Sequence, residues 1–382
     1  MRAVFSAAFR PFFLAAALWA ALAVPAWLLS YSGIAPLPAG VAPYIWHQHE
    51  MVFGFAFAAV AGFLLTAIPN WTGRLPLRGA PLAALVALWL AGRVALLLSA
   101  RLPAAAVAAV DLSFPLALIA VVARELIAGR NWRNLPMLAA LGLLFTGNLL
   151  VHLQQLGVAY TAFAGNRLGL ATLLMLIALI GGRIVPSFTR NWLAKRGAQA
   201  LPAPGGRVDA AALAVTLLAL ASWVAFPESL LMYALSLAAG IALAVRLSRW
   251  RGLATFGEPL VFVLHAGYGW LAFGLALVGV NGLFPFLPRS VALHALTIGA
   301  IGTMTLAVMT RATLGHSGRP LAASRSTLAA YLLVSLAALL RLAAPAAGGG
   351  YLAVTLVAGF VWSAAFLLFA AAYWSLLVPT KV

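Results

Sequence analysis

The chain has 382 residues, of which 65% are hydrophobic and 8% are charged, and its formal net charge is +18. A soluble domain carries about 25% charged residues, so this composition excludes a soluble globular protein. The absence of cysteine also excludes disulfides, thiolate metal ligands and cysteine-held iron–sulfur clusters.

Apolar runs of roughly 20 residues, the length that crosses a bilayer, recur along the whole chain. No connection between them is long enough for a soluble domain, so we expect one membrane domain over residues 1–382. The first run is predicted to be a true membrane helix and not a cleaved signal peptide. The fold class is therefore an all-α integral membrane protein with about twelve transmembrane helices, at 12–30, 46–68, 79–99, 104–124, 135–155, 167–185, 209–226, 229–247, 259–280, 289–310, 326–344 and 351–377.

The positions of the basic residues explain the net charge without a nucleic-acid partner. If the N-terminus is cytoplasmic, most of the 24 Lys and Arg residues fall in inside segments. Arg93 lies within a helix, and the outside segments hold only Arg101, Arg167, Arg289 and Arg341. This asymmetry follows the positive-inside rule. It predicts a multi-pass protein in the lipid bilayer of the bacterial inner membrane, with both termini in the cytoplasm.

The run 46–68 opens with the polar stretch WHQHEM, which is costly in a membrane helix unless it is used. Histidine is the commonest ligand for metals and also holds haem iron. At roughly 100° per residue, His47 and His49 point to nearly opposite sides, whereas His47 and Glu50 share a face. We therefore expect one helix to serve two sites. Small residues that permit close helix packing follow Glu50 at spacings of four: Gly54, Ala58 and Gly62.

Further polar residues are predicted to lie at the same membrane level. The direction of each helix places His152, Asn148 and His294 near the periplasmic face, with Arg93 and Asp111 in the outer half. This convergence indicates a metal or haem site, although a scatter of interfacial residues near helix ends would give a similar pattern. Arg93 and Asp111 are expected to form a structural ion pair more than to take part in chemistry.

The other two histidines are predicted to lie toward the cytoplasm. His265 falls in the inner half of 259–280, where a ligand and a hydrogen-bonded core histidine remain equally open. His316 falls in an inner loop and is expected to be solvated or to hydrogen-bond within the loop. If both bind metal, they form a second, inner site.

A weak repeat predicts three sets of four helices. Pro11, Pro136 and Pro259 each begin the first helix of a set, a normal position for proline. The second helix of each set ends in a related turn: AIPNWTGR, IVPSFTRNW and AVMTRATLGHSGR. His49 and His294 lie equally far before the arginine that closes their turns, so we expect them to be equivalent and to hold one haem iron or neighbouring metals. The shared demands of inward-running helices would also produce such a pattern.

Four segments resemble the NnrS family, and the resemblance covers nearly the whole chain. They are FRPFFLAAALWA at 9–20, WHQHEMVFGFAFAAVAGFLLTAIPNWTGR at 46–74, GGRIVPSFTRNWL at 181–193 and HALTIGAIGTMTLAVMTRATLGHSGR at 294–319. The resemblance implies an inner-membrane protein that carries haem and copper and is linked to denitrification and nitric oxide stress. The implied cofactors are b-type haem and copper, and nitric oxide is the implied small-molecule ligand.

On this basis we expect redox chemistry on nitric oxide, similar to that of a nitric oxide reductase. Glu50 is the candidate proton carrier, or else it orients His47. Quinol or a periplasmic carrier is the expected electron donor. The candidate metal ligands are His47, His49, His152 and His294, and His265 joins them as a candidate haem ligand.

Two other classes of protein remain open. Twelve helices with a few buried charges also fit a transporter for a metal, haem or a small solute. A non-catalytic haem-based gas sensor would bind the gas without turnover. The sensor class is disfavoured because the chain has no soluble output domain.

Overall fold

A computed structural model describes residues 3–380, and within that range it contains helices and no strands. Eleven helical runs in this range are long and apolar enough to cross a membrane, which confirms the all-α membrane fold. The last run, Arg325–Ala372, contains 48 residues and includes the final two predicted helices. At 1.5 Å per residue it would be about twice as long as a bilayer core is thick. It breaks at Gly348, where φ is +52°, so it provides two crossings.

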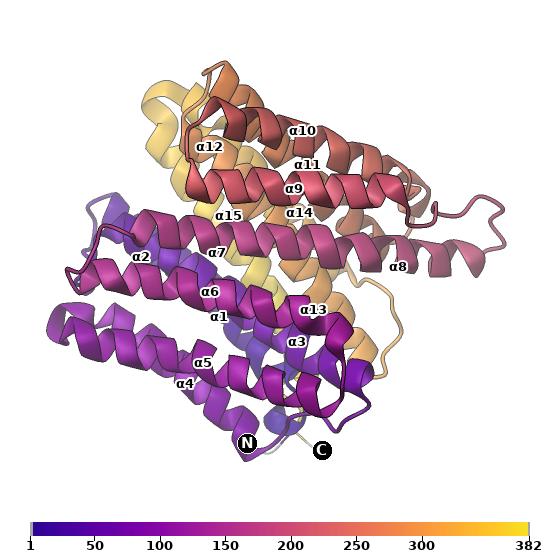
Figure 1. The fold of residues 1–382 in the computed structure, drawn as a ribbon, viewed down its shortest axis with the longest axis horizontal. Helices are drawn as coiled ribbons and strands as arrows, with labels where there is room; N and C mark the ends of the chain where they lie inside the picture. The colour runs from indigo at the N-terminus through magenta and orange to yellow at the C-terminus, as the bar shows by residue number, and fades with distance from the viewer. Residues whose placement is uncertain (1–2, 381–382) are drawn as a thin grey trace. The chain divides into compact units, whose positions relative to one another are not determined.

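The chain forms two compact units (Figure 1). Unit 1 comprises Met1–Thr172, Ala312–Arg319 and Phe366–Val382, and unit 2 comprises Leu173–Arg311 and Pro320–Ala365. Three helices, α7 (Ala162–Leu176), α13 (Thr303–His316) and α15 (Tyr351–Ala372), contribute residues to both.

Unit 1 holds the polar stretch that begins at Trp46. Its helix α1 packs on α3, α4 packs on α5, and α5 packs on α6. A Cβ on Gly62 of α3 would lie 2.8 Å from the Phe13 ring of α1, which confirms close packing along the small-residue stripe. The helices of this unit are η1 (Val4–Ser6), α1 (Phe9–Tyr31), α2 (Pro43–His49), η2 (Glu50–Ala56), α3 (Phe57–Thr72), α4 (Ala80–Leu97), η3 (Ser99–Arg101), α5 (Ala104–Ala128), η4 (Trp132–Asn134), α6 (Leu135–Gln155) and α16 (Trp374–Leu377).

Unit 2 is built around α10 and α11, which pack on each other, with α9 against α10. The π-helix η7 packs on α11 and α14. The helices of this unit are η5 (Ile177–Gly181), α8 (Gly182–Ala194), α9 (Arg207–Ala225), α10 (Leu230–Ser248), η6 (Gly252–Thr255), α11 (Pro259–Leu283), α12 (Arg289–His294), η7 (Ala295–Gly302), α14 (Arg325–Ala343) and η8 (Ala344–Gly350).

Two helices that are predicted to run inward extend beyond their predicted ends. The predicted run 46–68 becomes Pro43–Thr72, and Gly73 stops it with a φ of +69°. The predicted run 289–310 becomes Arg289–His316, so His316 ends helix α13 and does not lie in a loop as expected. Polar residues after Thr310 predicted a loop, but the helix continues because no proline and no residue of positive φ occurs before Gly318, where φ is +65°.

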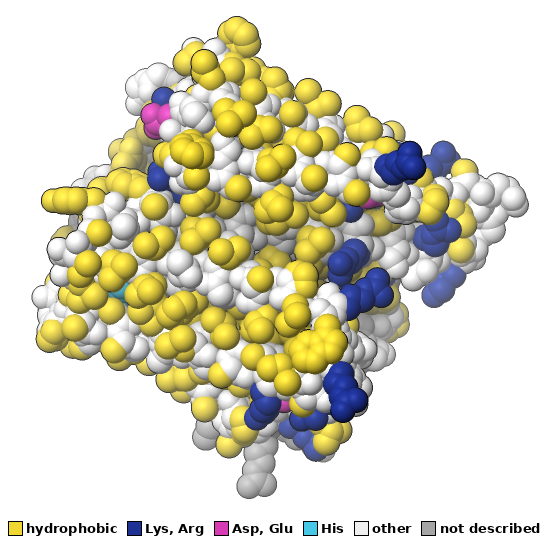
Figure 2. All heavy atoms as spheres, in the orientation of Figure 1, with side chains coloured by type: hydrophobic (Ala, Val, Ile, Leu, Met, Phe, Trp, Pro, Cys, Tyr) yellow, Lys and Arg dark blue, Asp and Glu magenta, His cyan; other side chains and the backbone are white. Residues whose placement is uncertain are grey.

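The surface fits a protein surrounded by lipid. Hydrophobic side chains cover the helix flanks in Figure 2, and Lys and Arg side chains gather at helix ends. Exposed leucines, valines and phenylalanines occur on helices of both units, which is unusual for a soluble protein and expected in a bilayer.

Candidate metal centre

Six polar side chains converge inside unit 1, and each is at most 2% exposed. They come from α2, the π-helix η2, α4, α5 and α6. In a membrane helix such groups are costly unless they pair with one another, which is what they do here. We call them the polar cluster: His49, Glu50, Arg93, Asp111, Asn148 and His152.

Arg93 joins the two carboxylates of the cluster. Its Nη1 donates to both oxygens of Glu50, at 2.8 and 2.9 Å, and its Nη2 donates to Oδ1 of Asp111. The predicted Arg93–Asp111 ion pair is therefore present. Two glycines make room for it. A Cβ on Gly54 would lie 2.8 Å from Nη1 of Arg93, and one on Gly92 would lie 2.6 Å from Oδ1 of Asp111.

His49 faces an acceptor oxygen at each ring nitrogen. Its Nδ1 donates to Oε1 of Glu50 at 3.0 Å, and its Nε2 faces Oδ1 of Asn148 at 2.7 Å. The Asn148 amide is fixed because its Nδ2 donates to Oδ2 of Asp111 at 2.8 Å. Without a metal, this geometry requires a proton on both nitrogens of His49. The resulting imidazolium and the Arg93 guanidinium together balance the two carboxylates.

His49 and His152 both lie next to Oδ2 of Asp111. His152 donates from Nε2 to this oxygen at 3.0 Å, and Nε2 of His49 lies 3.3 Å from it. One atom each of His49, Asp111 and His152 lies within 4.8 Å of the other two. These three residues are the one group of three or more potential metal ligands found among the described histidines and acidic residues.

The donor set suits a transition metal. Two imidazoles and one carboxylate form a ligand combination that binds iron, and neutral imidazole also binds copper. A ligating histidine usually donates its other ring N–H to a carboxylate, which fixes the ring and raises its basicity. Nδ1 of His49 makes such a bond with Glu50, so its Nε2 would become a ligand on losing one proton. The positive charge of the metal would then replace that of the His49 imidazolium.

A π-helix begins at the point of the chain where Glu50 pairs with His49. The π-helix η2 begins at Glu50, directly after His49 ends α2. Its wider turn changes the angles between neighbouring side chains, and π-turns are frequent at functional sites. The α-helical spacing paired Glu50 with His47, whereas the structure pairs it with His49. The sequence does not reveal this π-turn.

Aromatic rings surround the cluster. The Phe53 ring lies 5.1 Å from that of His49, and Nε1 of Trp89 donates to the carbonyl of Gly54 at 3.0 Å. Trp19 packs edge-on against Trp89. Sequence reasoning did not single out Trp19, Trp89 or Gly92. Trp89 lies one helical turn before Arg93, so the shared face of α4 was the available signal.

The remaining predicted histidines lie elsewhere. The His47 ring stacks on Trp27 at 4.1 Å, on a different side of the helix from His49, as its spacing predicted. His316 packs near the ring of Phe9. In unit 2, Nε2 of His265 bonds to the Thr189 hydroxyl at 2.8 Å, and Nδ1 of His294 donates to the Ser290 carbonyl. Their roles as ligands stay predictions.

The structure does show a local similarity around His49 and His294. Each is the last residue of a short α-helix, and each is followed at once by a π-helix, η2 or η7. This agrees with the predicted equivalence of the two positions. The middle repeat differs, because its π-helix η5 begins at Ile177, after the 15-residue helix α7 and not after a short one.

A comparison with curated proteins found no match. The family model described as NnrS protein matches residues 3–381, nearly the whole chain. This match agrees with the resemblance noted in the sequence, whose WHQHEM segment supplies His49 of the buried histidine–carboxylate group. The chain belongs to the NnrS family.

Proposed function

We propose that this protein binds a transition-metal ion through His49, Asp111 and His152 and uses it in nitric oxide metabolism. The observation that carries the proposal is the convergence of these three buried side chains within 4.8 Å. Family membership fits a membrane protein connected with nitric oxide. The inner membrane is the proposed location.

The other members of the polar cluster would hold the ligands in place. Glu50 orients His49 through Nδ1, and Arg93 fixes both Glu50 and Asp111. When bound, the metal would supply a position where nitric oxide binds and exchanges electrons. Asn148 lies against Nε2 of His49 and would be the nearest neutral polar group to a bound gas molecule.

Glu50 is the proposed proton carrier as well as the orienting group. It is fully buried and bonds directly to a proposed metal ligand. Joining two nitric oxide molecules to nitrous oxide and water consumes two electrons and two protons, so a reductase needs a proton path to the site. Quinol or a periplasmic carrier would supply the electrons.

The apolar surroundings suit a gas substrate. Each side chain of the polar cluster is at most 2% exposed, the Phe53 ring packs on His49, and nitric oxide partitions into apolar environments. A low-dielectric setting also strengthens the electrostatic interactions that hold the ligands. No polar channel for the substrate is required.

The histidines of unit 2 are the proposed haem ligands. Nδ1 of His294 is engaged by Ser290, which leaves Nε2 as the atom that could hold iron. Nδ1 of His265 is buried and without a hydrogen-bond partner among the described residues, although its Nε2 is engaged by Thr189. Nδ1 of His265 is therefore the atom of this residue that would hold haem iron.

Optical and electron paramagnetic resonance spectra of the purified protein, with and without nitric oxide, test the proposal. We expect the gas to change the signal of the wild-type protein in its reduced form. The signal of the cluster metal should be absent from His49→Ala and His152→Ala and retained in His47→Ala. Spectra that nitric oxide leaves unchanged in every sample would overturn the proposed function.

A further inference from the structure

A second polar site lies in unit 1 at the ends of α3 and α5. The loop 73–79 follows α3 and covers a cavity of about 480 Å³. The charge distribution predicts that these helix ends face the cytoplasm. The cavity is lined by Gly73, Arg74, Leu75, Pro76, Leu77, Arg78, Arg124 and Glu125, which we call the arginine pocket.

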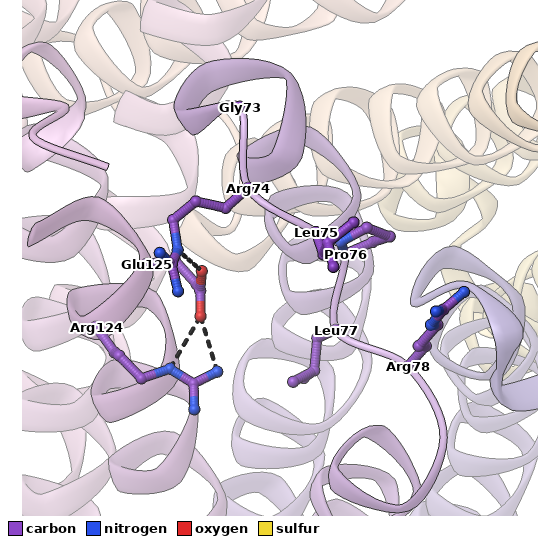
Figure 3. Close-up of a pocket in the computed structure, with 8 residues that line it drawn as sticks. All are labelled: Gly73, Arg74, Leu75, Pro76, Leu77, Arg78, Arg124 and Glu125. Atoms are coloured by element: carbon purple, nitrogen blue, oxygen red, sulfur yellow. Dashed lines mark hydrogen bonds and ion pairs between the residues drawn. The ribbon is translucent and has the colours of Figure 1, made fainter. Parts of the chain in front are cut away.

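The pocket carries an excess of positive charge. It holds three guanidinium groups and one carboxylate. Nε of Arg74 donates to Oε2 of Glu125 at 2.5 Å, and Arg124 donates to Oε1 from Nε and Nη2, at 2.9 and 2.8 Å. Figure 3 shows Glu125 between these two arginines, with Arg78 set apart from them. Arg78 makes no ion pair with any described carboxylate.

The arginines are held in place but remain accessible. The Glu125 side chain is only 11% exposed, while those of Arg74 and Arg124 are 43% and 61% exposed. Arg74 uses Nε in its ion pair with Glu125, and its two terminal nitrogens donate to no described residue. A nearly buried carboxylate thus orients two guanidinium groups whose other N–H donors remain available to a ligand.

The backbone around the pocket is fixed at both ends. The end of α3 packs against the end of α5, where a Cβ on Gly129 would lie 2.6 Å from Cβ of Thr72. Asn131 ties the two ends together by donating to the Trp71 carbonyl. At the far end of the loop, Gly79 donates to the Phe5 carbonyl at 2.8 Å.

An apolar group adjoins the charged one. Leu75 follows Arg74 in the loop and is 84% exposed. The loop connects two candidate membrane spans, Pro43–Thr72 and Ala80–Leu97. Guanidinium groups bind phosphate through paired N–H donors, and basic pockets between membrane helices bind lipid head groups on the cytoplasmic side. Guanidinium donors next to an exposed leucine match a phosphate that is linked to an apolar chain.

We propose that the arginine pocket binds the phosphate group of an anionic phospholipid. The phosphate contacts Arg74 and Arg124, Arg78 adds positive charge at the far side of the pocket, and Leu75 contacts the glycerol or acyl portion. An inorganic phosphate would offer the same oxygens without the apolar part. This lipid site is independent of the metal proposed for the polar cluster.

Native mass spectrometry of the full chain, released from detergent with added phosphatidylglycerol or phosphatidylcholine, measures the binding. We expect preferential retention of phosphatidylglycerol. Arg78→Gln should weaken that retention about fivefold, the typical effect of one basic residue near a lipid surface. The matched control is Arg133→Gln, which removes an exposed arginine outside the pocket on the same predicted side and should have no effect.

A double variant separates a built site from general positive charge. Arg74→Gln with Glu125→Gln leaves the net charge unchanged and removes the anchoring carboxylate. We expect several-fold weaker retention in this variant, with the thermal unfolding temperature of each variant checked in parallel. Retention that falls equally in Arg133→Gln, or persists in the double variant, would show charge attraction alone and overturn the proposal. Competition by inorganic phosphate without any lipid preference would overturn the assignment to a phospholipid.

Discussion

Arg93 is the residue that makes the polar cluster possible in a membrane. Its guanidinium group contacts both buried carboxylates, so neither Glu50 nor Asp111 is left as an isolated charge. Truncating one partner of a buried ion pair costs more than the pair contributes, because the other charge stays buried. The proposed metal ligand Asp111 and the proposed orienting group Glu50 therefore both depend on Arg93.

Replacing Arg93 with glutamine should destabilise the protein by about 3–5 kcal/mol, since it removes the cation that contacts both buried carboxylates and leaves one negative charge unbalanced. The measurement is thermal unfolding in detergent. Arg101→Gln, which alters an exposed arginine, is the matched control and should unfold close to the wild-type temperature. Equal unfolding temperatures for both variants would show that Arg93 is not the partner of these carboxylates.

Gly54→Ala tests how closely the cluster is packed. The new methyl group would lie within 2.9 Å of Arg93, Trp19 and Glu50, and such crowding costs about 1–3 kcal/mol. Gly142→Ala is the control, because a Cβ there meets no atom within 4 Å. We expect a lower unfolding temperature for the first variant and no loss for the second. A neutral Gly54→Ala would contradict the geometry of the cluster.

The sequence predicted which residues of unit 1 share a membrane level and one of their contacts, the Arg93–Asp111 ion pair. Helix direction and position placed His49, His152, Asn148, Asp111 and Arg93 near one depth, and all five do meet. The other contacts were not predicted, because they depend on which helices are neighbours and on how each side chain is turned.

At the scale of elements, the π-helix η2 is the decisive feature. It occupies Glu50–Ala56 between α2 and α3 and sets the rotation of His49 relative to the rest of the membrane helix. A π-turn contains one more residue than an α-turn, and no residue type in this segment requires it. Apolar periodicity predicted this helix and its approximate length, and tertiary packing determines the local irregularity.

Deleting Met51 should convert this π-turn to a regular α-turn and rotate His49 away from Asp111 and His152. We expect the purified variant to remain helical by circular dichroism and to lose its bound metal. A deletion at Ile180 within η5 provides the comparison, because it alters a π-helix that carries and adjoins none of the proposed ligands. Full metal content in the Met51 deletion would contradict the role given to η2.

At the scale of the molecule, composition was enough to predict a polytopic membrane protein. Apolar run length and charge asymmetry predicted the number of helices, and the long stretch Arg325–Ala372 accounts for the difference between eleven runs and twelve segments. The division into two compact units was not predicted. It depends on which helices pack together, and the uniform apolar character of the helix surfaces carries little information about that choice.

The predicted topology can be measured directly, because the chain contains no cysteine. Tyr160→Cys lies in a predicted outside loop and Gln199→Cys in a predicted inside loop, and both positions are exposed. A membrane-impermeant maleimide added to whole cells should label the first variant and reach the second only after the membrane is opened. The reverse pattern would invert the orientation that the positive-inside rule predicts.

We propose that His49, Asp111 and His152 form a metal centre. Its most direct test is the metal content of the purified full chain, measured for copper and iron in the wild type and in His49→Ala, His152→Ala and His47→Ala. We expect His49→Ala and His152→Ala each to lose the same metal ion and His47→Ala to retain it. Retention of all metals in both cluster variants, or an equal loss in His47→Ala, would contradict it.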